Sequence, residues 1–156
     1  MSQQRQRGTS FETNVVRYMR AALSQPDIER RALHGSRDMV DIYRIMGQHG
    51  LEGIAECKDH RTVTDSLVER WRAQTLSERD EAHAGFGLLV IHRRGKSSKS
   101  GAPSFGQNVV QVTIGDLLRL AGTEADVGDV GNIWVSMRLV DACSILLGGD
   151  ASGRLG

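Results

Sequence analysis

The segment VDIYRIMGQHGLEGIAECKDH, residues 40–60, predicts a β-hairpin at the centre of the fold. Apolar and polar residues alternate from Val40 to Met46 and again from Leu51 to Lys58, as they do in strands with one buried face. Between these stretches lies GQHG, residues 47–50, whose two glycines suit a hairpin turn. We therefore expect two antiparallel strands joined by this turn.

The turn decides which side chains of the hairpin face each other. If Met46 lies opposite Leu51, the same register puts Asp41 directly across from Glu56. The Cβ atoms of such a pair are about 4.5 to 5.5 Å apart, a distance at which like charges repel. Because side chains alternate along a strand, Lys58 shares a face with Glu56 and adds a positive charge there. We interpret the group as a site for a divalent cation and a water; the alternative is a surface hairpin with a cross-strand ion pair.

Lysine is rare in this chain, which makes Lys58 informative. Of the 20 basic residues only Lys58, Lys96 and Lys99 are lysines, and all the others are arginines. An ammonium is a compact donor that can take part in proton transfer, whereas a guanidinium is planar and stays protonated. We therefore expect a chemical role for Lys58.

A further carboxylate, Glu12, lies in the first predicted helix, Thr9 to Leu23. The apolar residues of this segment recur at helical spacing, and Glu12 falls inside the apolar stripe. One explanation is a capping box, Thr9-x-x-Glu12, in which the glutamate bonds back to the start of the helix. The other is a role in the hairpin site, because a carboxylate on a core-facing stripe is costly unless it is paired or metal-bound.

The size and composition of the chain limit its class. Its 156 residues, 39% hydrophobic and 25% charged, suit one globular domain, and we expect flexible tails at residues 1–7 and 150–156. No apolar run approaches the length of a membrane span, and the polar N-terminus is unlike a signal peptide. Cys57 and Cys143 have neither zinc-site nor disulfide spacing. These features predict a cytoplasmic protein with two buried, reduced thiols.

The rest of the chain alternates between helical and strand-like segments, with no internal repeat. This order predicts an α/β domain with a mixed central β-sheet flanked by helices. Helices are predicted over Thr64–Ala82 and Gly115–Ala121, with an apolar segment at Ala142–Leu147, and strands over Glu29–His34, Phe86–His92, Val109–Ile114 and Ile133–Leu139.

Three stretches of the sequence together resemble a known family. They are RGTSFETNVVRYMR at residues 7–20, which carries Glu12, VDIYRI at 40–45, which carries Asp41, and IAECK at 54–58. The pattern resembles the PD-(D/E)xK nuclease superfamily, and most closely its archaeal-type Holliday junction resolvases and related phage enzymes. The resemblance covers roughly residues 7–95, and Val40 stands where the superfamily has proline.

The resemblance implies a restriction endonuclease-like fold with an α-β-β-β-α-β core and a Mg²⁺-dependent endonuclease, in which Mn²⁺ can substitute. By this resemblance Asp41, Glu56 and the backbone carbonyl of Cys57 hold the metal. Glu12 helps to hold a water, and Lys58 positions or deprotonates it. Attack then leaves a 5′-phosphate and a 3′-hydroxyl.

The DNA contacts are expected mainly from the segment HRRGKSSKSGAPSFGQ, residues 92–107. Its basic residues, hydroxyls and glycines are typical either of a solvated loop or of a loop that grips phosphates without reading bases. With a nuclease site upstream we favour DNA contact and expect residues 93–107 to be mobile. The candidate DNA-binding residues are Arg7, Arg30, Arg31, His60, Arg93, Arg94, Lys96 and Lys99.

The resemblance also implies a partner and a substrate. A four-way junction has two symmetric strands to cut, so we expect a homodimer, with the apolar stretch Ile133–Leu147 as the candidate interface. The expected setting is the cytoplasm of a bacterium or of a phage-infected cell. Two alternatives remain open: a restriction- or repair-type nuclease that cuts linear duplex DNA, and a nuclease-like DNA-binding module without activity.

Overall fold

The computed structural model describes residues 2–31, 40–97, 99–123 and 126–148. Within them the chain forms four α-helices and six β-strands, and three short 3-10 turns, η1 to η3, lie between them. In chain order the elements are α1 (Gln3–Leu23), β1 (Glu29–Arg30), β2 (Ile42–Met46), η1 (Gln48–Gly50), β3 (Glu52–Lys58), α2 (Asp65–Glu81), β4 (Phe86–Ile91), η2 (Phe105–Gln107), β5 (Val109–Thr113), α3 (Ile114–Leu120), η3 (Gly128–Asn132), β6 (Trp134–Arg138) and α4 (Leu139–Leu147).

The six strands form one mixed sheet whose spatial order follows the sequence, β1 to β6. Strands β3 and β4 run parallel, and every other neighbouring pair is antiparallel. Parallel neighbours need a crossover connection, and here α2 supplies it. The predicted α/β domain with a mixed sheet flanked by helices is therefore confirmed.

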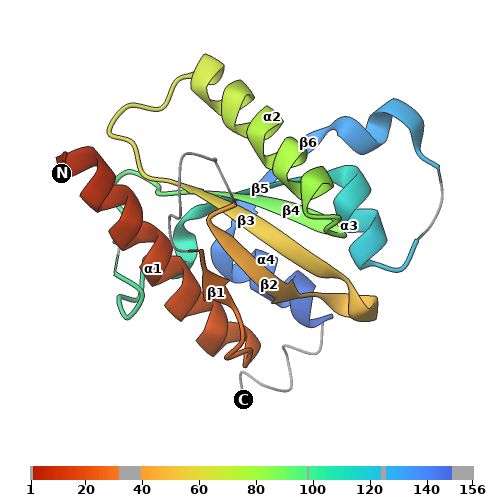
Figure 1. Cartoon of the computed structure of the whole chain (residues 1–156), viewed down its shortest axis with the longest axis horizontal. Helices are drawn as coiled ribbons and strands as arrows, with labels where there is room; N and C mark the ends of the chain where they lie inside the picture. Colours follow the sequence, from red (N-terminus) through yellow and green to blue (C-terminus); the bar gives the residue numbers. More distant parts are fainter. Residues whose placement is uncertain (1, 32–39, 98, 124–125, 149–156) are drawn as a thin grey trace.

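The helices cover both faces of the sheet. Helices α1 and α4 pack against each other on one face, and α2 crosses the other (Figure 1). The main core lies under α1 and α4, where Phe11, Met19 and Leu139 are fully buried. A smaller cluster, which contains Trp71 and Leu89, lies under α2. A side chain on β3 therefore faces either the main core or α2.

Helix α1 begins earlier than the sequence predicted. It starts at Gln3, after the N-cap Ser2, whose hydroxyl accepts a hydrogen bond from the Arg5 amide. Thr9 lies well inside the helix, where its carbonyl accepts the Thr13 hydroxyl at 3.0 Å. The predicted start at Thr9 is wrong, and residues 3–7 are helical rather than part of a tail. A capping box cannot form inside a helix, so that explanation of Glu12 is also wrong.

The hairpin has the predicted strands but a different turn. Residues 48–50 form a 3-10 turn, and Met46 pairs with Glu52 instead of Leu51. The predicted register is therefore wrong by one residue at the turn end. It changes between Ile45 and Ile42, because β2 carries a β-bulge there with Arg44 at φ 65°.

The bulge restores the predicted alignment at the other end of the hairpin. Beyond it, Ile42 pairs with Ala55, so the next positions along the two strands are Asp41 and Glu56. Without the extra residue, the register of the turn end would put Ile42 across from Glu56. The bulge thus decides which side chain meets Glu56.

Other predicted boundaries agree with the structure to within a few residues. Thr64 caps α2, as expected, by accepting the Leu67 amide at 3.3 Å. Strand β1 covers Glu29–Arg30, and the rest of the predicted strand, up to His34, falls largely in residues 32–39, outside the described part of the chain. The predicted tail 150–156 lies outside it as well. Within the described residues, no helix combines the length and apolar character that a membrane crossing needs.

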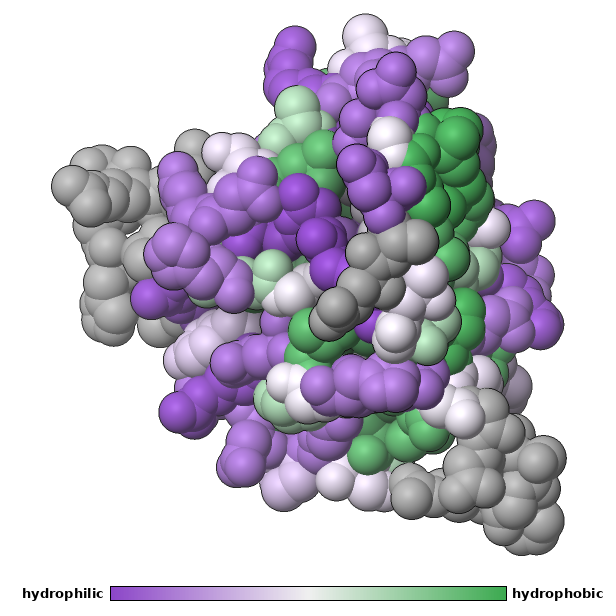
Figure 2. All heavy atoms as spheres, turned by 90° about the vertical axis from the view of Figure 1, so that its right-hand side faces the viewer, coloured by the Kyte–Doolittle hydropathy of each residue, from purple (hydrophilic) through white to green (hydrophobic). Residues whose placement is uncertain are grey.

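Part of the predicted dimer interface belongs to the core. Leu139 is fully buried and Leu146 is 4% exposed, whereas Ile133 is 51% exposed. Strand β6 pairs only with β5 and therefore forms an edge of the described sheet. On the face that carries the hairpin turn and α3, apolar patches alternate with hydrophilic side chains (Figure 2). The most exposed apolar side chain of Ile133–Leu147 is therefore Ile133, directly before the edge strand, whereas much of α4 packs in the core.

Candidate active site

The start of β2 and the end of β3 bring two carboxylates together. The backbone amide of Asp41 donates to Glu56 Oε1 at 3.1 Å, and the amide of Cys57 donates to Asp41 Oδ2 at 2.8 Å. Each carboxylate is thus held by the main chain of the opposite strand. The structure places Asp41 and Glu56 side by side, as the register argument expected.

Lys58 lies on the same face of β3, under α2. Its Nζ is 3.6 Å from Glu56 Oε2 and donates to Gln74 Oε1 at 3.1 Å. The side chain is 19% exposed, so the ammonium reaches the surface from a fixed position. The other face of β3 carries Ala55 and Cys57, which pack in the main core. The alternation expected for this strand is observed.

A buried glutamate that sequence reasoning missed completes the group. Glu78 of α2 is 6% exposed, and its Oε1 accepts the Gln74 amide at 3.2 Å. Its Oε2 is buried and has no hydrogen-bond partner. The sequence did contain a sign of it, because Trp71, Gln74 and Glu78 recur at helical spacing and so share one face of α2. Two polar residues on a stripe that faces the sheet indicate a polar site beneath the helix.

Glu12 reaches the hairpin from α1. Its Oε2 lies 3.4 Å from Arg30 Nη1, and its side chain is 18% exposed. Burial and the negative charge of Asp41 raise the pKa of Glu12 to about 7, although Arg30 opposes the shift. The structure therefore brings Glu12 next to Asp41, as the second explanation of this residue required.

Burial and mutual repulsion dominate the electrostatics of the group. The Glu56 side chain is 1% exposed, and burial, a hydrogen bond with Glu78 and the charge of Asp41 raise its pKa to about 11. Burial also raises the pKa of Asp41, despite the Cys57 amide and the Lys58 charge. One ammonium does not balance this many acids, so at neutral pH the group retains protons.

The Cys57 thiol takes no part in this chemistry. It is buried on the opposite face of β3, and burial raises its pKa well above the ordinary value. Cys143 is likewise buried in the main core, and burial raises its pKa to about 12. Both thiols are free. The expectation of two buried, reduced thiols is met.

The chemistry of the group fits a hard divalent cation. Its donors are carboxylate oxygens, which Mg²⁺ and Mn²⁺ prefer, and the buried Glu78 Oε2 accepts no hydrogen bond. As the side chains stand, the described part of the chain has no group of three or more His, Cys, Asp or Glu residues placed to hold a metal ion. Mg²⁺ needs fewer, since it commonly uses one or two carboxylates and keeps several waters. Asp41 and Glu56 are two neighbouring carboxylates of this kind.

Several of the predicted DNA-binding residues gather beside the end of β3. Arg7, His60 and Arg94 line one hollow, and Arg93 lines a second hollow next to it. Arg93 and Arg94 are both exposed. The structure therefore brings together residues that are far apart in sequence.

The remaining predicted DNA-binding residues lie apart from this group. Arg30 is paired with Glu12, and Arg31 lies over the ring of Tyr43, 5.5 Å from its centroid. In the basic loop, Lys99 is exposed and Lys96 is half-buried.

The basic loop is tied to its surroundings at several points. The Ser100 amide donates to Asn14 Oδ1 of α1 at 3.0 Å, and the Ser97 amide donates to Ser104 Oγ at 3.0 Å. Phe105 is fully buried in the main core. The mobility of residues 93–107 stays a prediction, and any large movement would break these contacts.

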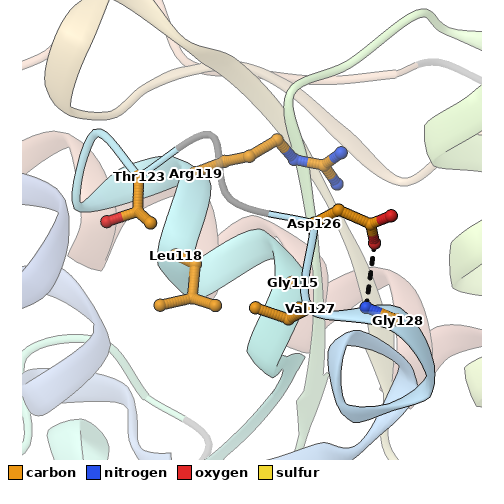
Figure 3. A pocket seen from close by; sticks show the side chains of 7 residues that line it. All are labelled: Gly115, Leu118, Arg119, Thr123, Asp126, Val127 and Gly128. Atoms are coloured by element: carbon orange, nitrogen blue, oxygen red, sulfur yellow. Dashed lines mark hydrogen bonds between the residues drawn. The ribbon is translucent and has the colours of Figure 1, made fainter.

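A further hollow lies between α3 and η3, away from the carboxylates (Figure 3). It shares no residue with the group around Asp41 and Glu56. Asp126 at its rim accepts the Gly128 amide at 2.9 Å, and Arg119 is already engaged by Asp116. Its lining is Gly115, Leu118, Arg119, Thr123, Asp126, Val127 and Gly128.

Comparison of the chain with protein-family models, with curated proteins and with solved structures finds no match.

Proposed function

We propose that the chain is a metal-dependent DNA endonuclease that cuts branched DNA. The observation that carries the proposal is the convergence of Asp41, Glu56 and Lys58 from one hairpin, with Glu12 brought to the same point by the preceding helix. The element order from α1 to β4 is α-β-β-β-α-β, the order expected from the family resemblance. Catalytic residues on rigid strands and a buried helix suit the precise placement of a reacting phosphate.

The metal would be held by Asp41, Glu56 and the backbone carbonyl of Cys57, as one or two Mg²⁺ or Mn²⁺ ions. A cation bound there supplies positive charge that polarises a phosphodiester and makes water more acidic. It also meets the need for positive charge among the acids, since a cation can replace the protons that Glu56 and its neighbours otherwise retain.

The protein's own residues have separate tasks in the reaction. Lys58, fixed by Gln74, donates hydrogen bonds toward the negative charge that develops on the phosphate. Glu12 has a pKa of about 7, which suits a group that holds the attacking water and accepts its proton near neutral pH. Water attacks phosphorus, the bond to the 3′ oxygen breaks, and a 5′-phosphate and a 3′-hydroxyl remain.

Paired cuts across a junction would need two such sites. The described residues of one chain contain one candidate group of this kind, so the proposal includes a two-fold homodimer. The exposed Ile133 and the edge strand β6 are the candidate contact surface. Sedimentation that shows a monomer at high concentration, with junction DNA bound, would rule the dimer out.

The direct test is a cleavage assay on matched duplex, forked and four-way DNA. We expect nicking of the four-way substrate with Mg²⁺ or Mn²⁺, none with chelator, and little with Ca²⁺ although it binds. The control is Asp41→Asn, which keeps the size of the side chain and removes a metal-binding charge. Equal cutting of linear duplex would favour a restriction- or repair-type nuclease. Full Mg²⁺-dependent activity of Asp41→Asn would contradict the site, and DNA binding without cutting under all conditions would contradict the enzyme.

A further inference from the structure

A basic hollow lies directly beside the end of β3. It is lined by Arg7 of α1, by His60 and Arg61 from the segment after β3, and by Arg94 from the loop after β4. With His92, which also lines it, five cationic or potentially cationic side chains from three distant parts of the sequence therefore share one depression. Arg61 was not among the residues that the sequence analysis selected.

The acidic residue that lines this hollow, Asp59, is already engaged in contacts within the protein. The carboxylate of Asp59 is 2.8 Å from His92 Nδ1, and its backbone carbonyl accepts the Gln4 side-chain amide at 2.6 Å. Its side chain is only 7% exposed. The same His92 contacts the Lys96 carbonyl at 2.7 Å through its other ring nitrogen, which fixes the basic loop against this acid. Asp59 therefore serves internal contacts, and the groups that face solvent are basic.

The arginines of the hollow have no acidic partner in the described part of the chain. Within the described residues, no ion pair is found for Arg7, Arg61 or Arg94. Burial, followed by the charge of Lys58, lowers the pKa of His60; Asp59 opposes this shift and Arg7 adds to it. Unpaired arginines around a concave surface are typical of an anion site.

A second hollow adjoins the first and has a different lining. It shares His60, Arg61 and Arg94 with the first and adds apolar side chains such as Val63 and Val68. The ring of His60 packs against Trp71 with centroids 4.9 Å apart, so a buried aromatic supports the wall between the two hollows. A charged depression beside a partly apolar one matches a phosphate and the nucleoside attached to it.

We propose that the two hollows bind one backbone phosphate of a DNA strand and its adjoining nucleoside, with Arg61 and Arg94 as the phosphate contacts. Arg61 is three positions after Lys58, so their Cα atoms are at most about 11 Å apart. A strand held here is therefore within a few nucleotides of the proposed catalytic group. Contacts of this kind position a strand without reading its sequence.

This inference rests on the proposed function only in naming DNA as the ligand, so its test avoids cleavage. Binding of fluorescent duplex and four-way DNA is measured with chelator present, over a range of salt concentrations. Arg61→Ala and Arg94→Ala should each weaken binding about five- to tenfold, and each should lower the slope of log K against log salt by about one. Arg94→Lys keeps the charge and should keep the slope.

The matched control is Arg70→Ala on α2. Arg70 is exposed and lines neither hollow, so its removal should leave affinity and slope unchanged. Thermal melting of every variant checks the fold. Wild-type affinity and slope in both Arg61→Ala and Arg94→Ala would overturn the inference, even if the protein cuts DNA. A lower affinity and a lower slope in these two variants would support the inference, even if no cutting is found.

Inorganic phosphate distinguishes a DNA strand from a free phosphate as the ligand. In NMR titrations, phosphate should shift the His60 signals only weakly, and duplex DNA should abolish that shift. If the alanine variants lose phosphate binding but bind DNA like the wild type, the hollow takes free phosphate and the inference is wrong.

Discussion

Two buried acidic groups in this molecule differ in how their charge is balanced. Asp116 of α3 is fully buried, and it accepts hydrogen bonds from Arg79 at 2.9 Å and from the Gly87 amide at 3.0 Å. Arg119 also contacts it. This acid ties α2, α3 and β4 together, and each of its oxygens has a partner.

Glu56 is almost as deeply buried as Asp116, but it has fewer partners. Only Lys58 brings a positive charge close to Glu56, at 3.6 Å, and an oxygen of Glu78 has no partner at all. Burial and the neighbouring acids raise the pKa of Glu56 to about 11. The chain can satisfy a buried carboxylate where packing requires it, as Asp116 shows. Incomplete balance at the hairpin therefore supports a functional role, because sites of function are where such rules are broken.

The largest expected effect tests this contrast through stability. Asp116→Ala should lower the free energy of unfolding by about 3 to 5 kcal/mol, because it leaves the mostly buried Arg79 with only the exposed Asp80 as a partner and the buried Gly87 amide without an acceptor. Glu56→Gln should change it by less than about 1 kcal/mol at pH 7, because the glutamate is protonated there and glutamine has the same shape. Urea unfolding in the presence of chelator measures both. Equal costs would mean that the two groups are alike.

The next effect concerns Lys58 and its chemical role. Lys58→Arg should bind four-way DNA with near-native affinity but cut it about a hundredfold more slowly or worse, the scale of losing a donor positioned toward the charge of the transition state. The guanidinium keeps the charge, but it cannot take the place of a compact ammonium between Gln74 and Glu56. Single-turnover cleavage and binding are measured on the same preparation. Cutting at the native rate would reduce Lys58 to a structural cation.

A smaller effect is expected at Glu12. Glu12→Gln should slow cleavage about tenfold or more while the melting temperature changes little. The residue has no capping role to lose, and its ion pair with Arg30, at 3.4 Å, is partly exposed. Rate and melting temperature are compared with those of Arg30→Ala, which removes the same ion pair from the other side. If both variants slow cleavage equally, the ion pair matters rather than the carboxylate.

The smallest effect is a pH dependence of stability. Glu12 has an ordinary pKa of 4.5 and a folded-state pKa of about 7, so between these values the folded protein holds a proton that the unfolded chain has lost. Its contribution to stability therefore falls as pH rises through this window. Between pH 5 and pH 8 the wild type should lose on the order of 1 kcal/mol more than Glu12→Gln does. His60, whose pKa is lowered, should make stability rise with pH. Because His60 is present in both proteins, this opposite trend cancels when the two are compared. If the wild type instead gained stability relative to Glu12→Gln as the pH rises, the burial of Glu12 would be contradicted.

The parts of the fold that the sequence predicted are those with strong local patterns. The hairpin strands alternate clearly, and α2 has a threonine cap, so their types and approximate limits followed from local rules. The start of α1 could not be predicted in this way, because residues 3–8 are polar and carry no apolar stripe that would indicate a helix. Its early turns are nevertheless helical, capped by Ser2 and anchored by Gln4 on the Asp59 carbonyl.

The candidate site was only partly visible in the sequence, for a related reason. Asp41, Glu56 and Lys58 follow from the geometry of one hairpin, whereas Glu78 and Arg61 join the site or its surroundings through contacts between distant segments. The bulge was also missed, although Ile42 and Ile45 are both buried and lie three residues apart in the same strand. Strict alternation would point these two side chains in opposite directions, so this spacing was a usable sign of an extra residue.

The parallel pairing of β3 with β4 has a consequence for the order of folding. The hairpin joins residues that are close in the chain and can form on a microsecond timescale, but β4 reaches β3 only after the whole of α2 has crossed the sheet. Asp41 and Glu56 can therefore meet early, while Glu78 is pressed against them late. We expect Glu78→Gln, which relieves that repulsion, to slow unfolding and to leave the folding rate nearly unchanged. A stopped-flow chevron in which the folding arm moves instead would place the closure of α2 before the rate-limiting step.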